Sequence, residues 1–128
     1  MRVLVVEDDG LVRDLAAEAL ANEGYEVLTA SDGTEAARLL NQPDPVEVLL
    51  TDVMLQGWID GADIVEMARL RVPGMPILIM SGFSEGLLGR LAGLQPPLGF
   101  LPKPFGLAQL AAALDRVVNF GATEPGET

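Results

Sequence analysis

Five short runs rich in apolar and β-forming residues constrain the fold of this 128-residue chain more than any other feature. They occupy residues 3–6, 25–30, 46–51, 77–80 and 99–101. The run at 3–6 is continuously apolar, which is typical of a strand that is covered on both faces of a sheet. Strands that alternate with helices pair in parallel through right-handed crossovers. The sequence therefore predicts an α/β domain with a doubly wound, five-stranded parallel sheet.

Apolar residues recur at helical spacing between most of these runs. Residues 11–20 and 107–118 follow the helical period clearly, and shorter helices are expected at 35–40 and 62–71. Gly24 is expected to end the first helix, because glycine is favoured just beyond helix C-termini. Each predicted helix thus supplies a crossover or closes the domain.

The segment 84–98 does not give a clear helix, because its glycines and prolines oppose one. Its leucines are interpreted as buried core, with a partner-binding patch as the alternative: Leu87, Leu88, Leu91 and Leu94. Residues 120–128 are rich in Gly, Glu and Thr, which is typical of a disordered tail or linker. One domain is therefore expected at 1–119, followed by a tail at 120–128.

Composition excludes several classes of chemistry. Cysteine and histidine are both absent, so disulfides, thiolate or imidazole metal sites and histidine-based catalysis are excluded. A net charge of −11 argues against direct binding to nucleic acid or anionic membranes. No apolar run reaches the roughly 18–20 residues that span a bilayer, and the N-terminus does not resemble a signal peptide. We therefore expect a cytoplasmic protein without membrane insertion.

Polar side chains gather where the predicted strands end. Ligands of open parallel sheets bind beyond the carboxyl ends of the strands. The residues that follow or end four of the strands are Glu7, Asp8, Asp9, Asp52, Ser81 and Lys103. Clustered carboxylates repel one another unless a cation neutralises them, and Mg²⁺ prefers such oxygen ligands. A carboxylate is also a nucleophile toward phosphorus, so this rim suggests phosphorylation of an aspartate.

Each of these residues also has an ordinary structural interpretation. Asp9 alone is more often a helix cap, and Ser81 alone is more often a turn residue. Lys103, the only lysine in the chain, is by itself usually a solvated surface residue. The combination at four strand ends favours a functional site.

At these residues the sequence resembles the receiver domains of bacterial response regulators, over about residues 1–119. The resemblance rests on four fragments in order: 3–9 with its acidic residues, 50–55 around Asp52, 79–82 with Ser81-Gly82, and 100–105 with Lys103-Pro104-Phe105. It implies the flavodoxin-like fold with strand order 2-1-3-4-5.

The resemblance also implies a role for each matching residue. Asp52 would be the phosphoacceptor. Asp8 and Asp52 would bind Mg²⁺ directly, Glu7 would act through a bound water, and Met54 would offer its backbone carbonyl. Lys103 would hold phosphoryl oxygens, and its bond to Pro104 would be cis.

Further roles concern the surroundings of the phosphoryl group. Ser81 would also hold a phosphoryl oxygen, and Gly82 would leave room for the group to enter. Phe100 would be an aromatic switch that turns inward as Ser81 moves. Met54 and Phe83 are apolar and could shield the acyl phosphate from water, which gives the hypothesis of a long-lived phosphorylated state.

Some residues depart from the usual pattern of the family. Glu7 replaces the commoner aspartate, and Gln56 stands where many members have proline. The loop 57–61 is one residue longer than in the shortest members. Phe100 lacks the hydroxyl of the frequent tyrosine, so it has no switch hydrogen bond to offer.

Three function classes follow from these observations. The first is a phosphoacceptor that receives phosphate from a histidine kinase or phosphotransfer protein and catalyses only its own phosphorylation and dephosphorylation. The second is a receiver-like interaction module that works without phosphate. The third, a Mg²⁺-dependent phosphatase with an aspartyl intermediate, would need an Asp-x-Asp arrangement that the adjacent acids here do not form. The output partner, and whether this is a single-domain regulator or part of a longer protein, stay open.

Overall fold

The structure is a computed structural model that describes residues 1–55, 57–81, 89, 91 and 93–120. Its strands are β1 (Arg2–Val6), β2 (Glu26–Ala30), β3 (Val48–Asp52), β4 (Ile77–Ser81) and β5 (Gly99–Pro102). Its helices are α1 (Gly10–Asn22), α2 (Gly33–Leu40), α3 (Gly61–Arg71) and α5 (Leu107–Phe120). All five predicted strands and all four predicted helices are present, with ends shifted by one or two residues.

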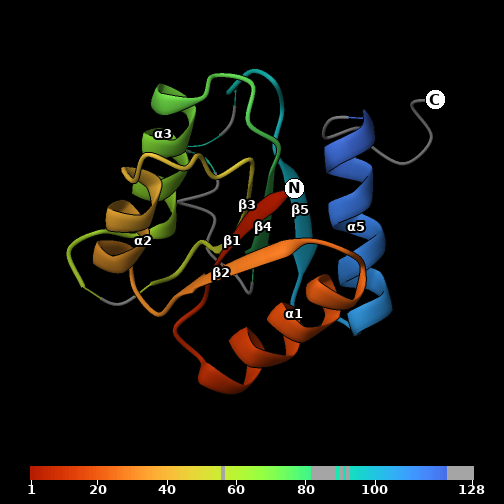
Figure 1. The fold of residues 1–128 in the computed structure, drawn as a ribbon. Helices are drawn as coiled ribbons and strands as arrows, with labels where there is room; N and C mark the ends of the chain where they lie inside the picture. The colour runs from red at the N-terminus through yellow and green to blue at the C-terminus, as the bar shows by residue number, and fades with distance from the viewer. Residues whose placement is uncertain (56, 82–88, 90, 92, 121–128) are drawn as a thin grey trace.

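The strands form one parallel sheet in the order β2-β1-β3-β4-β5 (Figure 1). This confirms the predicted flavodoxin-like fold and strand order. The order reverses direction beside β1, which lies between β2 and β3. A reversal of this kind separates the loops on either side and opens a crevice at the carboxyl ends of the strands. The fold therefore places the predicted site where α/β proteins bind ligands.

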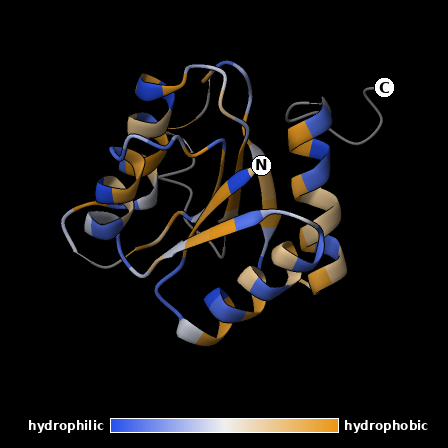
Figure 2. Ribbon diagram, viewed as in Figure 1, coloured by the Kyte–Doolittle hydropathy of each residue, from blue (hydrophilic) through white to orange (hydrophobic). Residues whose placement is uncertain are grey.

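The sheet is covered on both faces, with α2 and α3 on one face and α1 and α5 on the other (Figure 1). Successive residues of a strand point to opposite faces, so β1 supplies both layers. Leu4 and Val6 pack toward α2 and α3, whereas Val3 and Val5 pack toward α1 and α5. Figure 2 shows hydrophobic residues dominating the strands, while each helix carries both kinds. Burial on both faces explains why the central strands β1, β3 and β4 are mostly apolar, whereas the edge strand β2 includes the exposed Glu26 and Thr29.

Two of the leucines in segment 84–98 can be assigned to the core or to a partner-binding patch from the structure. Leu91 is buried in the core beside α3, and Leu94 packs against the same core. The core interpretation is therefore confirmed for these two leucines. Leu87 and Leu88 lie outside the described residues, as does the tail at 121–128.

The junction between α1 and β2 agrees with the role predicted for Gly24. Helix α1 ends at Asn22, and Gly24 has a φ of 97°, a conformation that other residues adopt only with strain. The chain then enters β2 through Tyr25, the only tyrosine of the sequence, which packs against the core beneath α1 and α5. The glycine therefore lets the chain turn directly from the helix into the sheet.

Tyr25 should titrate above the ordinary tyrosine value of about 10. Burial raises the pKa of its hydroxyl, and the negative charges of Asp115 and Glu23 raise it further. The folded protein therefore disfavours tyrosinate. The stability that the protonated Tyr25 contributes is complete below pH ~10 and is lost as the pH rises through the folded-state pKa. The ultraviolet absorbance of tyrosinate measures the midpoint in a single transition. Asp115→Asn should lower that midpoint; a wild-type midpoint at or below the ordinary value would contradict the expectation.

Candidate functional site

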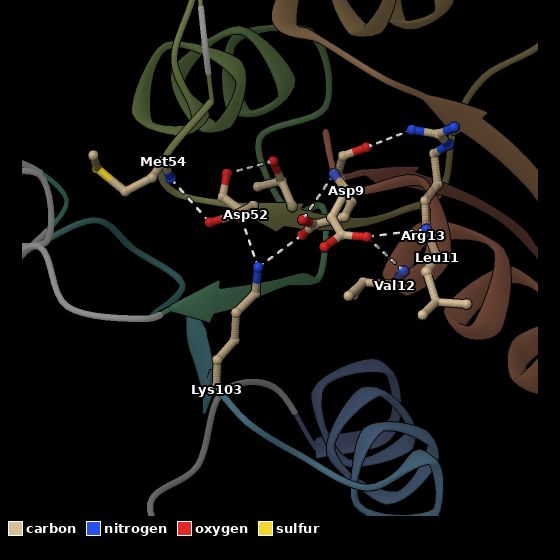
Figure 3. Close-up of polar contacts among 9 residues, drawn as sticks. Asp9, Leu11, Val12, Arg13, Asp52, Met54 and Lys103 are labelled. Atoms are coloured by element: carbon tan, nitrogen blue, oxygen red, sulfur yellow. Dashed lines mark hydrogen bonds and ion pairs between the residues drawn. The ribbon is translucent and has the colours of Figure 1, made fainter.

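Three strand ends bring two carboxylates and one ammonium group into direct contact (Figure 3). Glu7 follows β1, Asp52 is the last residue of β3, and Lys103 follows β5. The Nζ of Lys103 lies 2.7 Å from Oδ2 of Asp52 and 3.0 Å from Oε2 of Glu7. The parallel sheet brings the carboxyl ends of these strands to one edge, and the side chain of Lys103 reaches past β4 to the two acids. Lys103 therefore forms ion pairs with both carboxylates.

Asp52 is nearly buried and is held from several sides. Its side chain is 8% exposed, and its Oδ1 accepts a hydrogen bond from the backbone N–H of Met54 at 3.0 Å. The buried hydroxyl of Thr51 donates to the carbonyl of Asp52 at 2.9 Å. Gly61, the first residue of α3, packs so tightly that a Cβ there would lie 2.1 Å from that carbonyl oxygen. The carboxylate of Asp52 is thus fixed before any ligand arrives.

Glu7 is the most buried acid of the cluster, with a side chain 1% exposed. Its Oε1 accepts from the backbone N–H of Asp9 at 3.2 Å, and Lys103 binds the other oxygen. Burial raises the pKa of Glu7 above its usual value, and the negative charge of Asp52 raises it further. The hydrogen bond from Lys103 lowers this pKa and offsets part of the rise. Such a carboxylate is costly to leave unpaired, which explains its close contact with the lysine.

Lys103 stays a charged ammonium group in this environment. Burial by itself lowers the pKa of Lys103, but its hydrogen bonds to Asp52 and Glu7 and their negative charges raise it above the ordinary value. The bond between Lys103 and Pro104 is cis, as the sequence resemblance implied. A fixed positive charge therefore stands beside the Asp52 carboxylate.

The acidic cluster fits a divalent metal ion. One carboxylate oxygen from each of Glu7, Asp8 and Asp52 lies within 4.8 Å of the others. Asp8 is exposed, whereas the other two are buried, so the cluster opens to solvent on one side. Ligands that are all hard oxygen atoms suit Mg²⁺, which keeps some of its waters. The three acidic residues thus match the predicted cation.

Asp9 has a different role from its acidic neighbours. Its Oδ1 accepts from the backbone N–H groups of Leu11 and Val12 at 3.0 and 3.2 Å, which makes Asp9 the N-cap of α1. The capping interpretation of this residue is confirmed.

The residues expected around the phosphoryl group are only partly described. Ser81 ends β4 beside Pro102 of β5, which places its backbone at the same rim, but its side chain lies outside the described part. Gly82 and Phe83 also lie outside it. Phe100 is on β5 with 48% of its surface exposed, and Met54 is 54% exposed. The side chains of Phe100 and Met54 are therefore both accessible to solvent.

Two features of the site were not predicted from the sequence. Arg13 donates through a terminal guanidinium nitrogen to the backbone carbonyl of Glu7 at 2.9 Å. An apolar groove of about 220 Å³ adjoins Lys103 and is lined by Val12, Leu15, Lys103, Pro104, Phe105 and Leu107. The position of Arg13 shortly after the acidic residues was a signal that could have drawn attention to it.

The fold and the site define a receiver domain. The family model of the response regulator receiver domain matches residues 3–115, so the chain belongs to this family of two-component signalling proteins. This confirms the resemblance seen in the sequence.

Relatives include both regulators and a kinase. Response regulator MprA of Mycobacterium sp. (strain KMS) is 35% identical over 130 residues, covering 99% of this chain and 54% of MprA. Sensor kinase CckA of Brucella abortus is 32% identical over 118 residues, covering 91% of this chain and 12% of CckA. The chain therefore spans about half the length of MprA and a small part of CckA.

Solved receiver structures share the fold over nearly the whole chain. A response regulator receiver protein from Sinorhizobium medicae WSM419 gives a TM-score of 0.83 at 26% identity, covering 94% of this chain and 96% of that one. The receiver domain of the hybrid histidine kinase CckA gives a TM-score of 0.72 at 34% identity, covering 91% of this chain and 97% of that one. Among the described residues, none of the helices has the length and apolar character of a membrane span.

Proposed function

We propose that this domain accepts a phosphoryl group on Asp52 from a histidine kinase or phosphotransfer protein, in a reaction that depends on Mg²⁺. The observation that carries the proposal is the position of Asp52. Its nearly buried carboxylate lies 2.7 Å from the Lys103 ammonium and within metal-sharing distance of Glu7 and Asp8. Such a carboxylate is presented as a nucleophile beside groups that neutralise phosphoryl charge.

The reaction requires little covalent chemistry from the protein. An oxygen of Asp52 attacks the phosphorus of a phosphohistidine, the P–N bond breaks, and its electron pair returns to the imidazole nitrogen. The product on this chain is an acyl phosphate. Lys103 exchanges its bond to the Asp52 carboxylate for one to a phosphoryl oxygen, and so neutralises charge that develops during transfer. Mg²⁺ bound by Asp8, Asp52 and the Met54 carbonyl, with Glu7 acting through a water, would supply further neutralisation.

The remaining roles concern the signal after transfer. Ser81 would bind a phosphoryl oxygen, Gly82 would leave room for it, and Phe100 would turn from its exposed position toward the site. That movement would change the output face. Met54 and Phe83 would shield the acyl phosphate, so that the phosphorylated state lasts well beyond seconds at neutral pH.

The wider protein context belongs to the same proposal. The chain spans only part of MprA and CckA, so it serves either as a single-domain regulator or as the receiver of a longer protein. We place it in the cytoplasm, where kinases have access to it, with no direct contact to nucleic acid. The domain turns over no separate substrate and catalyses only its own phosphorylation and dephosphorylation.

Thermal denaturation with Mg²⁺ and beryllium fluoride, a phosphoryl mimic, tests the proposed site. A ligand at about ten times its Kd that binds only the folded state stabilises it by about 1.4 kcal/mol. We expect stabilisation of the wild type by Mg²⁺, a further increase with beryllium fluoride, and no beryllium fluoride effect in Asp52→Asn. Equal responses of the two proteins to beryllium fluoride would contradict the role of Asp52. No response of the wild type to either ligand would favour an interaction module that works without phosphate.

A further inference from the structure

Arg13 is a cation beside the acidic cluster that the proposed phosphotransfer does not use. It lies on the second turn of α1 and reaches back to the end of β1, where it donates to the Glu7 carbonyl at 2.9 Å (Figure 3). Its other terminal nitrogen lies 3.5 Å from the point where a Cβ on Gly10 would be. The guanidinium group therefore lies over the first residue of the helix.

Arg13 completes the hydrogen bonding of Glu7. The backbone N–H of Glu7 donates to the carbonyl of Ala30 on β2 at 3.1 Å. Its carboxylate accepts from Asp9 and Lys103 at 3.2 and 3.0 Å. The remaining polar group, its carbonyl oxygen, accepts from Arg13. Each polar group of Glu7 is thus held by a different partner.

The carbonyl that Arg13 holds belongs to the peptide joining Glu7 to Asp8, two of the three grouped acids. A peptide unit is planar, so the position of the Glu7 oxygen also sets the direction in which the Asp8 backbone leaves. Asp8 is exposed, and its side chain depends on this backbone for its direction. A rotation of the peptide would therefore move one carboxylate relative to the others.

We propose that Arg13 is a positioning residue for the metal site, which it organises through the peptide between Glu7 and Asp8. This inference rests on the proposed function, because it assumes that the acidic cluster binds Mg²⁺. Partners that orient metal ligands typically affect affinity strongly. The positive charge of Arg13 acts in the opposite direction, because a nearby cation repels Mg²⁺. Removal of Arg13 thus weakens metal binding if its role is positioning, and strengthens binding if it acts only through charge.

Calorimetric titration with Mg²⁺ distinguishes these two effects. We expect Arg13→Met to raise the Kd for Mg²⁺ on the order of tenfold. Arg13→Lys keeps the charge and an N–H donor, so its Kd should lie closer to that of the wild type. Arg38→Met removes the same charge from an exposed position on α2 and should leave the Kd unchanged. Circular dichroism at the titration temperature verifies that each variant is folded.

The outcomes separate this inference from the proposed function. If the wild type binds Mg²⁺ and Arg13→Met binds as tightly or more tightly, Arg13 does not position the site, although the proposed function stands. If the wild type does not bind Mg²⁺, the metal requirement fails, and the role of Arg13 fails with it. Weaker binding by Arg13→Met, with recovery by Arg13→Lys and no change in Arg38→Met, supports the inference.

Discussion

Lys103→Met should slow the phosphorylation of Asp52 by acetyl phosphate by about two orders of magnitude. The wild-type ammonium group lies 2.7 Å from the attacking carboxylate and is held there by Glu7 as well. Methionine has similar bulk but provides no charge for the phosphoryl oxygens. The initial rate of phosphate gain, followed by intact mass at saturating Mg²⁺, measures the effect.

Lys103→Arg is the matched variant for this prediction. It keeps the positive charge but replaces a compact ammonium group with a planar guanidinium group. Its phosphorylation rate should therefore fall between those of the wild type and Lys103→Met. A Lys103→Met protein that is phosphorylated as quickly as the wild type would show that the ammonium group takes no part in the transfer.

Gly61→Ala should lower the free energy of unfolding by about 3 kcal/mol. A Cβ at this position would lie 2.1 Å from the carbonyl oxygen of Asp52 and 2.6 Å from the Cα of Val53. Both are backbone atoms of the strand end that carries the acceptor, so relief requires the start of α3 to move away from β3. Chemical denaturation measures the loss, and phosphorylation should slow as well because Asp52 is displaced.

Gly74→Ala is the control for this substitution. No neighbouring atom lies within 4 Å of a Cβ at Gly74, and its φ is not positive. Its stability should therefore stay within about 0.5 kcal/mol of the wild type. Equal stability of the two alanine variants would contradict the close approach of α3 to the acceptor strand.

The location of the site could be predicted because it follows from the topology of the fold. Continuous apolar runs identify strands buried on both faces, and alternation with helices makes those strands parallel. Residues just after such strands then share one edge of the sheet. This reasoning is sufficient to bring Glu7, Asp52 and Lys103 together, and the structure confirms that they meet.

The local partners of these residues could not be predicted, since they depend on side-chain directions. The sequence does not indicate that Lys103 contacts Glu7 as well as Asp52, or that Glu7 is almost fully buried. It likewise does not indicate that Arg13 turns back from α1 toward the Glu7 carbonyl. Hydrogen bonds of this kind arise from packing between elements and have no periodic signal.

Helix starts show the same limit on a smaller scale. Asp60 and Asp63 form a reciprocal capping box, with bonds of 2.8 and 2.9 Å, at the start of α3. The sequence predicted a loop at 57–61 and a helix beginning at residue 62, whereas α3 begins at Gly61. Capping aspartates also occur in turns that lead to no helix, so the residue type alone does not distinguish the two.

Phosphorylation of Asp52 is tested most directly by the intact mass of the wild type and Asp52→Asn after incubation with acetyl phosphate and Mg²⁺. Asparagine has nearly the same shape as aspartate but lacks the nucleophilic carboxylate. We expect one added phosphate on the wild type, none when the metal is chelated, and none on Asp52→Asn. A wild type that gains no phosphate, or an Asp52→Asn protein that gains as much, would contradict the assignment of Asp52 as the phosphoacceptor.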